Sequence, residues 1–236
     1  MLLSANLALA DLTDANLMDA DLREINLSST NLTGACLRGA NLREEQRRDS
    51  ANLRGAILCR VDLQGANLQG ADLVKVNLQG ANLQNVNLKG AKLSQANLQG
   101  ANLSNALLSE ADLTEANLQG VKLLSAKMER ITLTQANLSG CDLEKANLTD
   151  AIATQTNFSQ VNLQHAKLNR ANLSRANLEK ANLTEALLVN AYLARANLSH
   201  ANCTRANLAR AELSSATLID ILWTGATMPD GSEFVA

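Results

Sequence analysis

The residues capable of nucleophilic or metal chemistry are few and widely separated in this sequence. The two histidines, His165 and His200, stand apart, and the cysteines show none of the spacings typical of zinc ligands; they are Cys36, Cys59, Cys141 and Cys203. Carboxylates are numerous, but nothing gathers them in a cleft where a pKa would shift. No glycine-rich phosphate-binding motif is present. We therefore predict that the protein is not an enzyme and has no catalytic, metal-binding or cofactor-binding residues.

Basic side chains are concentrated in the last third of the chain. They surround a single tyrosine, and the candidate partner-binding set is Arg170, Arg175, Tyr192, Arg195, Arg205 and Arg210. One interpretation is a solvated, charge-balanced surface, since Glu179, Glu185 and Glu212 are nearby. The other is a docking patch for an acidic protein surface. The whole chain has a formal net charge of −2, which predicts no general attraction to nucleic acid or to anionic lipid.

The elements that position these residues come from a five-residue repeat. The 236 residues are 46% hydrophobic but only 2% aromatic, so large rings cannot fill the core. Instead Ala-Asn/Asp-Leu-x-x recurs, with Leu7 to Leu42 in one register and Leu53 to Leu218 in a second. The exceptions to Leu in the second block are Met128, Ala153, Phe158 and Cys203.

A five-residue period predicts extended segments and not helices. Residues at this spacing scatter around a helix axis, whereas Ala and Leu two positions apart share one face of a strand. The Asn or Asp between them then points outward, and the last two residues turn the chain. Four near-right-angle turns close a coil of about twenty residues, and stacked coils pair as parallel strands about 4.8 Å apart.

Residues spaced by twenty support this coil. One outward column contains Asn at every position from Asn77 to Asn197, which predicts a ladder of hydrogen-bonded amides. A second column alternates in charge, and Thr114, Thr134 and Thr154 form a third. The alternating column contains Glu110, Arg130, Asp150 and Arg170. Gly55 to Gly140 recur at the last position of the repeat, where a turn with positive φ would favour glycine; beyond Gly140 that position holds residues such as Lys145, which leaves the turn type open.

This repeat resembles that of the pentapeptide-repeat family, and its ending is similar to that of cyanobacterial members. The resemblance implies an all-β fold, a right-handed quadrilateral parallel β-helix with about four repeats per coil, over a single domain spanning 1–236. It implies little about function, because members of one fold serve different roles. Some members bind partners in cell-differentiation signalling, and a fluoroquinolone-resistance branch mimics DNA to modulate gyrase.

The repeat breaks between Leu42 and Leu53, which are eleven residues apart instead of ten. We interpret this as one inserted residue, and we expect 43–50 to bulge outward, since charged side chains cannot enter a dry core unpaired. The segment is either a tolerated surface insertion or a contact loop for a partner. Its candidate residues are Arg43, Glu44, Glu45, Gln46, Arg47, Arg48 and Asp49.

The two ends differ. Residues 221–236 depart from the repeat, and we predict that Trp223 and Met228 help to cap the C-terminal end of the core. At the N-terminal end the repeats begin at once, so that edge is either frayed or paired with a second subunit. A monomer and an end-to-end dimer both remain open.

A rod without a cleft offers area but cannot enclose a small molecule, so we predict no small-molecule substrate. The leading hypothesis is a scaffold that binds a protein partner whose identity is unknown. The alternative, a DNA-mimic modulator of gyrase or topoisomerase, is disfavoured by the near-neutral charge. Binding of nucleic acid is also disfavoured, because a lone Tyr192 is no stacking platform. No apolar run could span a membrane, the start lacks the basic region of a signal peptide, and we predict a cytoplasmic protein.

Overall fold

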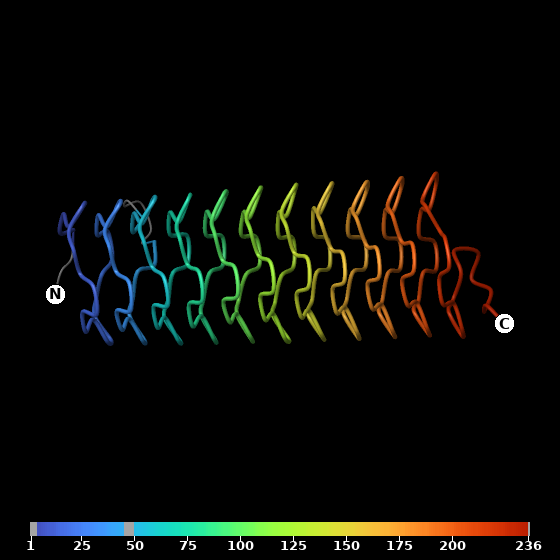
Figure 1. Ribbon diagram of the computed structural model, residues 1–236, viewed down its shortest axis with the longest axis horizontal. Helices are drawn as coiled ribbons and strands as arrows, with labels where there is room; N and C mark the ends of the chain where they lie inside the picture. The colour runs from blue at the N-terminus through green and yellow to red at the C-terminus, as the bar shows by residue number, and fades with distance from the viewer. Residues whose placement is uncertain (1–3, 45–49, 236) are drawn as a thin grey trace.

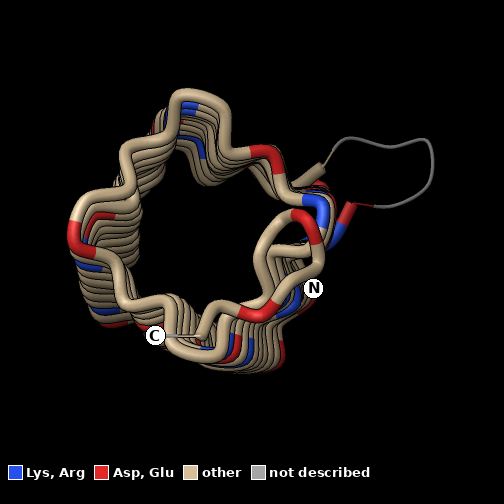
Figure 2. Tube along the Cα trace, turned by 90° about the vertical axis from the view of Figure 1, so that its right-hand side faces the viewer, with Lys and Arg blue, Asp and Glu red and all other residues tan. Residues whose placement is uncertain are grey.

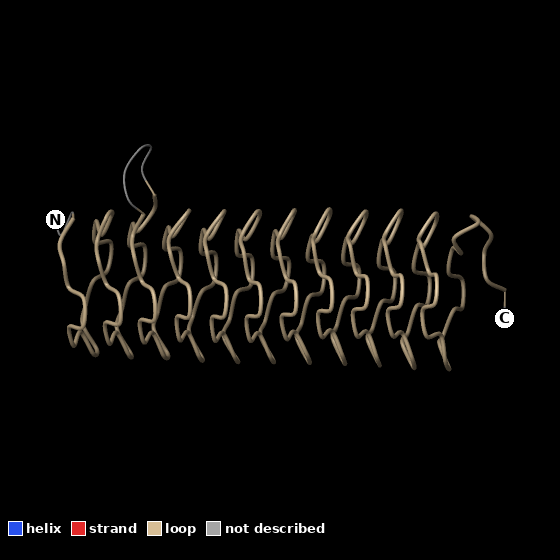
Figure 3. Ribbon diagram, turned by 90° about the horizontal axis from the view of Figure 1, so that it is seen from above, coloured by secondary structure: helices blue, strands red, loops and turns tan. Residues whose placement is uncertain are grey.

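The computed structural model describes residues 4–44 and 50–235, and in these ranges the chain winds as a solenoid (Figure 1). Successive coils follow one another along the long axis from the N-terminal to the C-terminal end, as a second view at right angles also shows (Figure 3). The described residues contain no helix, and their β-structure consists of isolated bridges, each one residue long. The strand contributed by each repeat is therefore a single bridge position flanked by turns.

The bridges form four columns along the axis. Except across the irregular segment between Leu42 and Leu53, parallel bridge residues pair with the residue twenty positions later, as Asn97 does with Asn117. The columns begin at Asn6, Asp11, Asn16 and Asp21, and we name them faces 1, 2, 3 and 4 in that order. Three backbone hydrogen bonds support each step. Leu98 donates to the carbonyl of Asn117 at 2.7 Å, Gly100 donates to the carbonyl of Gln119 at 3.0 Å, and Asn117 donates to the carbonyl of Ala96 at 2.9 Å.

The core is a stack of small and branched aliphatic side chains. Ala and Leu flank each bridge residue and point inward, because side chains on an extended segment alternate. They are buried from Leu22 to Leu208, and so are Met128, Ala153, Phe158 and Cys203 at the leucine position. Polar atoms enter this core only with a partner. Thr156, at an alanine position, donates its hydroxyl to the carbonyl of Leu133 at 2.7 Å.

The turns keep one backbone conformation along the whole rod. The N–H of Ala101 donates to the carbonyl of Leu98 at 2.9 Å, and Gly100 before it has a φ of 67°. Beyond Gly140 the same position has φ 58° in Lys145 and 60° in Arg175. The absence of glycine therefore does not change the turn. A left-handed residue with a Cβ costs about 1–2 kcal/mol, so the hydrogen-bonded coils on either side must impose this conformation.

The irregularity between Leu42 and Leu53 is larger than the sequence suggested. Asn26 pairs with Asn52 and Asn41 with Asn67, so these partners are 26 positions apart instead of twenty. The prediction of one inserted residue was wrong. Because all four faces stay aligned on both sides, six residues are inserted in the turn between face 4 and face 1. Glu45, Gln46, Arg47, Arg48 and Asp49 lie outside the described residues.

At the C-terminal end the chain folds back on its last coil. Thr227 and Glu233 form the one antiparallel bridge of the described residues, and Phe234 donates to the carbonyl of Ala226 at 2.8 Å. Trp223 and Met228 are partly buried against the core. Leu218, at a leucine position of the repeat, is nevertheless 42% exposed, because no described residues stack on that side of the coil.

Candidate protein-interaction surface

The solenoid sorts the predicted basic residues by edge. We name each turn after the face that it follows, so turn 4 leads into face 1 and turn 1 leads out of it. Tyr192 lies on face 1, bridged to Asn172 and Glu212. Arg170 and Arg210 lie on turn 4, and Arg175 and Arg195 lie on turn 1. The structure thus brings five of the six predicted residues to one face, which we name the arginine–tyrosine surface: Arg170, Arg175, Tyr192, Arg195 and Arg210.

Arg205 does not belong to this surface. It lies on turn 3, between faces 3 and 4, where its Nη1 is 3.6 Å from Oε1 of Glu185. The sequence could not separate it from the others, because the edge that a turn residue occupies depends on its position within the twenty-residue coil and not on its distance along the chain.

Five of the eleven described arginines pair with an acid on a neighbouring coil: Arg38, Arg54, Arg130, Arg170 and Arg205. Arg170 is an example: its Nε and Nη2 donate to the two carboxylate oxygens of Asp150, each at 2.7 Å. This hydrogen-bonded pair lowers the pKa of Asp150. The same kind of ion pair joins Arg54 to Asp72, at 2.9 Å, and Arg130 to Glu110.

Three arginines of the surface differ. Among the described residues Arg175, Arg195 and Arg210 have no acidic oxygen within 4.0 Å, and all three are exposed. Arg175 and Arg195 follow one another on turn 1, one coil spacing of about 4.8 Å apart along the axis. Two like charges stacked without a counter-charge repel each other, so an anionic partner bound beside them would be stabilised.

Apolar area accompanies these charges. Tyr192 is 53% exposed, and Ile152, two coils earlier on the same face, is 47% exposed. A tyrosine combines a large apolar ring with a hydroxyl that can donate or accept, which is why it is frequent at the centre of protein interfaces. Face 1 therefore offers an aromatic group bordered on both edges by cations.

The described ends of the inserted segment border the same face. Its described first residues, Arg43 and Glu44, lie on turn 4, and the N–H of Glu44 donates to the carbonyl of Gln69 at 2.7 Å. A Cβ at Gly70 would overlap the side chain of Glu44, so glycine leaves room for it. The sequence presented the insertion and the arginines as unrelated candidates. They share an edge because the insertion adds six residues without rotating the faces.

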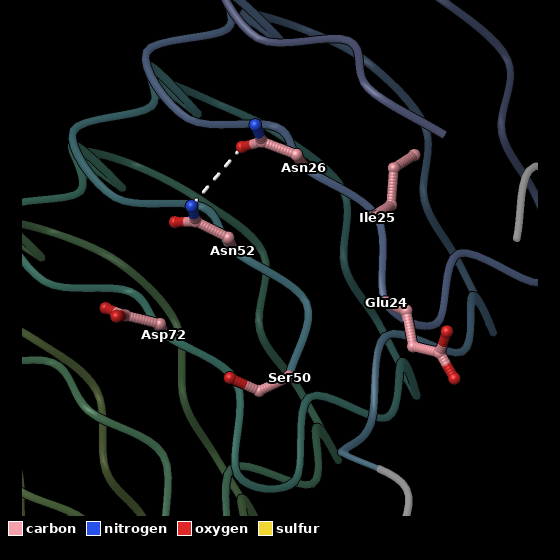
Figure 4. A pocket seen from close by; sticks show the side chains of 6 residues that line it. All are labelled: Glu24, Ile25, Asn26, Ser50, Asn52 and Asp72. Carbon is pink, nitrogen blue, oxygen red and sulfur yellow. Dashed lines mark hydrogen bonds between the residues drawn. The ribbon is translucent and has the colours of Figure 1, made fainter. Parts of the chain in front are cut away.

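A shallow hollow lies at the foot of the insertion (Figure 4). It has a volume of about 360 Å³ and is lined by Glu24, Ile25, Asn26, Ser50, Asn52 and Asp72. Asn52 donates its amide to Oδ1 of Asn26 at 3.3 Å, and Asp72 is held by Arg54. The described residues contain no group of three His, Cys, Asp or Glu that could hold a metal ion. The hollow is thus a polar recess in which two of the lining amides bond to each other and Asp72 is paired with an arginine outside the lining.

Charges on turn 4 alternate in sign from Glu110 to Arg170. Viewed down the axis, basic and acidic positions are interspersed around the ring (Figure 2). The predicted ladder on turn 4 forms: Arg130 pairs with Glu110, and Arg170 pairs with Asp150. On face 2 the predicted asparagine ladder forms at four of the six steps from Asn77 to Asn197, with amide bonds such as Asn157 to Asn137 at 3.1 Å. The predicted threonine column is present too, with 3.3 Å between the hydroxyls of Thr134 and Thr154.

The remaining reactive side chains fall where the repeat predicts. Cys141 and Cys203 are buried, and burial raises the pKa of each thiol to about 12. Cys36 and Cys59 are partly exposed. His165 lies 3.3 Å from Glu185 and His200 lies 3.6 Å from Asp220, on different turns, so the histidines do not meet.

The fold defines a class of protein, the right-handed β-helical solenoids built from short repeats. A family model described as pentapeptide repeats matches residues 5–43, 49–85, 91–130, 126–164, 156–193 and 186–221. The chain belongs to the pentapeptide-repeat family.

Solved structures include a similar protein. The chain is 35% identical to HetL, a pentapeptide-repeat protein involved in heterocyst differentiation regulation in the cyanobacterium Nostoc sp. strain PCC 7120. The alignment covers 99% of this chain and 93% of HetL, with a TM-score of 0.54. No curated protein matches the chain.

Two further structures are more distant. QnrB1, a plasmid-mediated fluoroquinolone resistance protein, is 17% identical over 66% of this chain and 82% of its own, with a TM-score of 0.38. Rfr23 from the cyanobacterium Cyanothece 51142 is 31% identical over 50% of this chain and 61% of its own, with a TM-score of 0.14. Neither superposition is close enough to carry an argument about this chain. Across the two described ranges, no helix has the length and apolar character needed to cross a membrane.

Proposed function

We propose that this protein is a non-enzymatic scaffold, a quadrilateral solenoid of four repeats per coil in a single domain, that binds a protein partner in the cytoplasm. The arginine–tyrosine surface on face 1 binds an acidic segment of that partner. The observation that carries the proposal is a contrast among the arginines. Arg54, Arg170 and Arg205 form ion pairs with acids on neighbouring coils, whereas Arg175, Arg195 and Arg210 have no acid within 4.0 Å among the described residues and surround the exposed Tyr192.

The energetics fit a docking surface with one anchor. An exposed ion pair contributes about 0.2–1 kcal/mol, so three such pairs set orientation and association rate more than affinity. The larger contribution comes from an aromatic ring that becomes fully buried, typically at least about 2 kcal/mol at the centre of an interface. Tyr192 lies between the charged edges and can take that role.

The inserted segment 43–50 is the second contact in this proposal. Its described ends lie on turn 4 beside face 1, seven coils before Tyr192, or about 34 Å away at the spacing of parallel strands. A partner that lies along face 1 would contact both. Similarity to HetL supports a regulatory binding role, since that protein is involved in the regulation of heterocyst differentiation. Face 1 would be open both in a single chain and in an end-to-end dimer, so the proposal requires neither state.

The proposal is tested by site-specific photo-crosslinking. The photoreactive amino acid benzoylphenylalanine replaces Tyr192 on face 1 or, as the control, Asn182 on face 3, and each protein is irradiated in lysate of the source organism. We expect a crosslinked protein from position 192 and none of the same mass from position 182. The crosslink should disappear in the variant Arg175→Glu, Arg195→Glu, Arg210→Glu.

A matched charge control accompanies that variant. Lys122→Glu, Lys145→Glu and Lys180→Glu change the net charge equally but lie on face 3, turn 3 and turn 2. This control should retain the crosslink. Equal crosslinking from faces 1 and 3, or equal loss in the two charge variants, would refute the surface. Arg47→Glu with Arg48→Glu tests the inserted segment separately.

We propose no gyrase-directed function. A DNA mimic must repeat negative charge along its length, and the acidic positions of turn 4 alternate with arginines that neutralise them. Face 2 presents uncharged asparagines from Asn77 to Asn197. If purified gyrase nonetheless lost supercoiling activity with the protein present, this exclusion would be wrong.

A further inference from the structure

The last coil of the rod presents strand edges whose hydrogen-bonding groups are unused. In inner coils the leucine and the second turn residue donate to the following coil, as Leu193 does to Glu212 at 2.7 Å and Arg195 does to Ser214 at 2.9 Å. The equivalent N–H groups on faces 1 to 3 of the last coil have no acceptor among the described residues. They belong to Leu213, Ser215, Leu218, Asp220 and Trp223. The same edge exposes Leu218 and, 59% exposed, Leu222.

The first described coil presents the complementary edge. Inner bridge residues donate backward, as Asn26 does to the carbonyl of Ala5 at 2.9 Å, and their carbonyls accept from the preceding coil. In the first coil these groups pair with no described residue. They are the N–H and C=O of Asn6, Asp11, Asn16 and Asp21. Leu7, Leu12 and Leu17 are only partly buried there, so apolar surface accompanies the open edge.

We propose that the C-terminal coil is a docking site for the N-terminal coil of a second copy of this chain, and that the tail after Thr227 blocks it. The two edges match because they continue the interface that already joins every pair of neighbouring coils. The first coil is built from the same Ala-Asn/Asp-Leu units as the inner ones, so the last coil would receive it as the next coil of the rod. Such a contact is heterologous and does not close, so it builds chains of rods.

The tail occupies one quarter of that docking site. Glu233 bridges Thr227, Phe234 donates to Ala226 at 2.8 Å, and Gly225 donates to Phe234 at 3.1 Å. The tail therefore lies beside face 4 at strand-pairing distance, in the place where face 4 of a stacked coil would lie. The four faces of a stacked coil are joined by hydrogen-bonded turns, so the coil cannot pair on three faces while the tail fills the place of the fourth. With the tail in place the rod stays a monomer, and with the tail displaced its C-terminal coil can bind the N-terminal coil of another copy.

The test compares the full chain with a chain that ends at Met228, by sedimentation velocity over a wide range of concentration. We expect the full chain to sediment as a single rod. The shortened chain should show a concentration-dependent series of larger species whose average mass at least doubles, with longer rods visible by electron microscopy. Circular dichroism and thermal melting verify that the shortened chain is folded.

Substitutions in the first coil identify the surface that docks. Asn16→Pro removes an N–H that pairs with nothing in the described chain, so it should abolish association of the shortened chain. Asn16→Ala loses the same side-chain acceptor of the Met18 N–H but keeps the backbone donor, and it should leave association intact. Association that survives Asn16→Pro would mean contact between two C-terminal ends and would overturn the proposal.

A full-length variant guards against loss of folding. Phe234→Pro removes the donor to Ala226 and releases the tail without shortening the chain. It should associate as the shortened chain does. If the folded shortened chain, or Phe234→Pro, remains a single rod at every concentration, the tail is not a stop and the inference is wrong.

Discussion

The asparagine ladder of face 2 has a direction, and this direction makes a strong prediction. Asn157 donates its amide to Oδ1 of Asn137 at 3.1 Å. The two amides are oriented by the backbone, because Oδ1 of Asn157 accepts the N–H of Ser159 and Oδ1 of Asn137 accepts the N–H of Ser139, each at 3.1 Å. Each oxygen thus faces its own turn, and each NH₂ is free to reach toward the preceding coil.

Replacing either residue by Asp changes the same atoms and the same charge with opposite consequences. Asn157→Asp removes the donor and places a carboxylate oxygen against Oδ1 of Asn137. Asn137→Asp keeps both acceptor roles and gives Asn157 a charged acceptor. The chain already contains this second arrangement, since Asn162 donates to Asp142 at 2.9 Å and Asn82 donates to Asp62 at 3.0 Å.

The magnitude follows from these bonds. Loss of one neutral hydrogen bond costs about 0.5–1.5 kcal/mol, and a charged acceptor adds up to about 1 kcal/mol over a neutral one. The free energies of unfolding of the two variants should therefore differ by about 1–2 kcal/mol, with Asn157→Asp the less stable. For a chain of this size that corresponds to about 3–6 °C in Tm.

The assay is differential scanning calorimetry of the two single variants and the parent at pH 7. Comparison within a matched pair removes the effect of net charge, which changes equally in both. Equal shifts in Tm would refute the directional ladder, and a lower Tm for Asn137→Asp would reverse it.

Three further predictions concern the turns, the thiols and the core. Gly34 and Gly100 both have positive φ, but a Cβ at Gly34 would overlap the carboxylate of Asp14, whereas nothing lies within 4 Å of a Cβ at Gly100. Gly34→Ala should therefore lower the midpoint of chemical denaturation more than Gly100→Ala does. Adding Asp14→Ala should abolish the difference. Burial raises the pKa of Cys141 and Cys203 from 9.0 to about 12, so the stability that these protonated thiols contribute is intact below pH 9 and is lost as the pH rises toward 12; a free energy of unfolding that stays constant between pH 9 and 12 would contradict the burial. A thiol reagent at neutral pH should modify Cys36 and Cys59 and should react with the buried pair only when the protein unfolds. Leu118→Ala removes a fully buried side chain and should cost about 2–5 kcal/mol, while Leu118→Asp should abolish the circular dichroism spectrum of the fold; a folded Leu118→Asp protein would show that this position does not face the core.

Much of the fold could be predicted from the sequence because every repeat places its apolar and polar side chains in the same local pattern. Ala and Leu two positions apart can share a buried face only on an extended segment, and residues such as Asn77 and Asn97 align only if a coil holds twenty residues. The buried positions of Phe158 and Cys203 followed from the same period. Turn conformation was not predictable beyond Gly140, because the neighbouring coils hold Lys145 and Arg175 at a positive φ that their own side chains disfavour.

The interaction surface depended on a feature that local pattern does not contain. The sequence by itself determined which side chains are outward and basic, from Arg170 to Arg210, and that an insertion follows Leu42. Only the tertiary structure decided that the insertion adds six residues, that Arg205 lies on another edge, and that Arg43 shares turn 4 with Arg170. The physical reason is that burial depends on two neighbouring residues of one repeat, whereas the edge that a residue occupies depends on how backbone groups twenty or more positions apart pair in the stack.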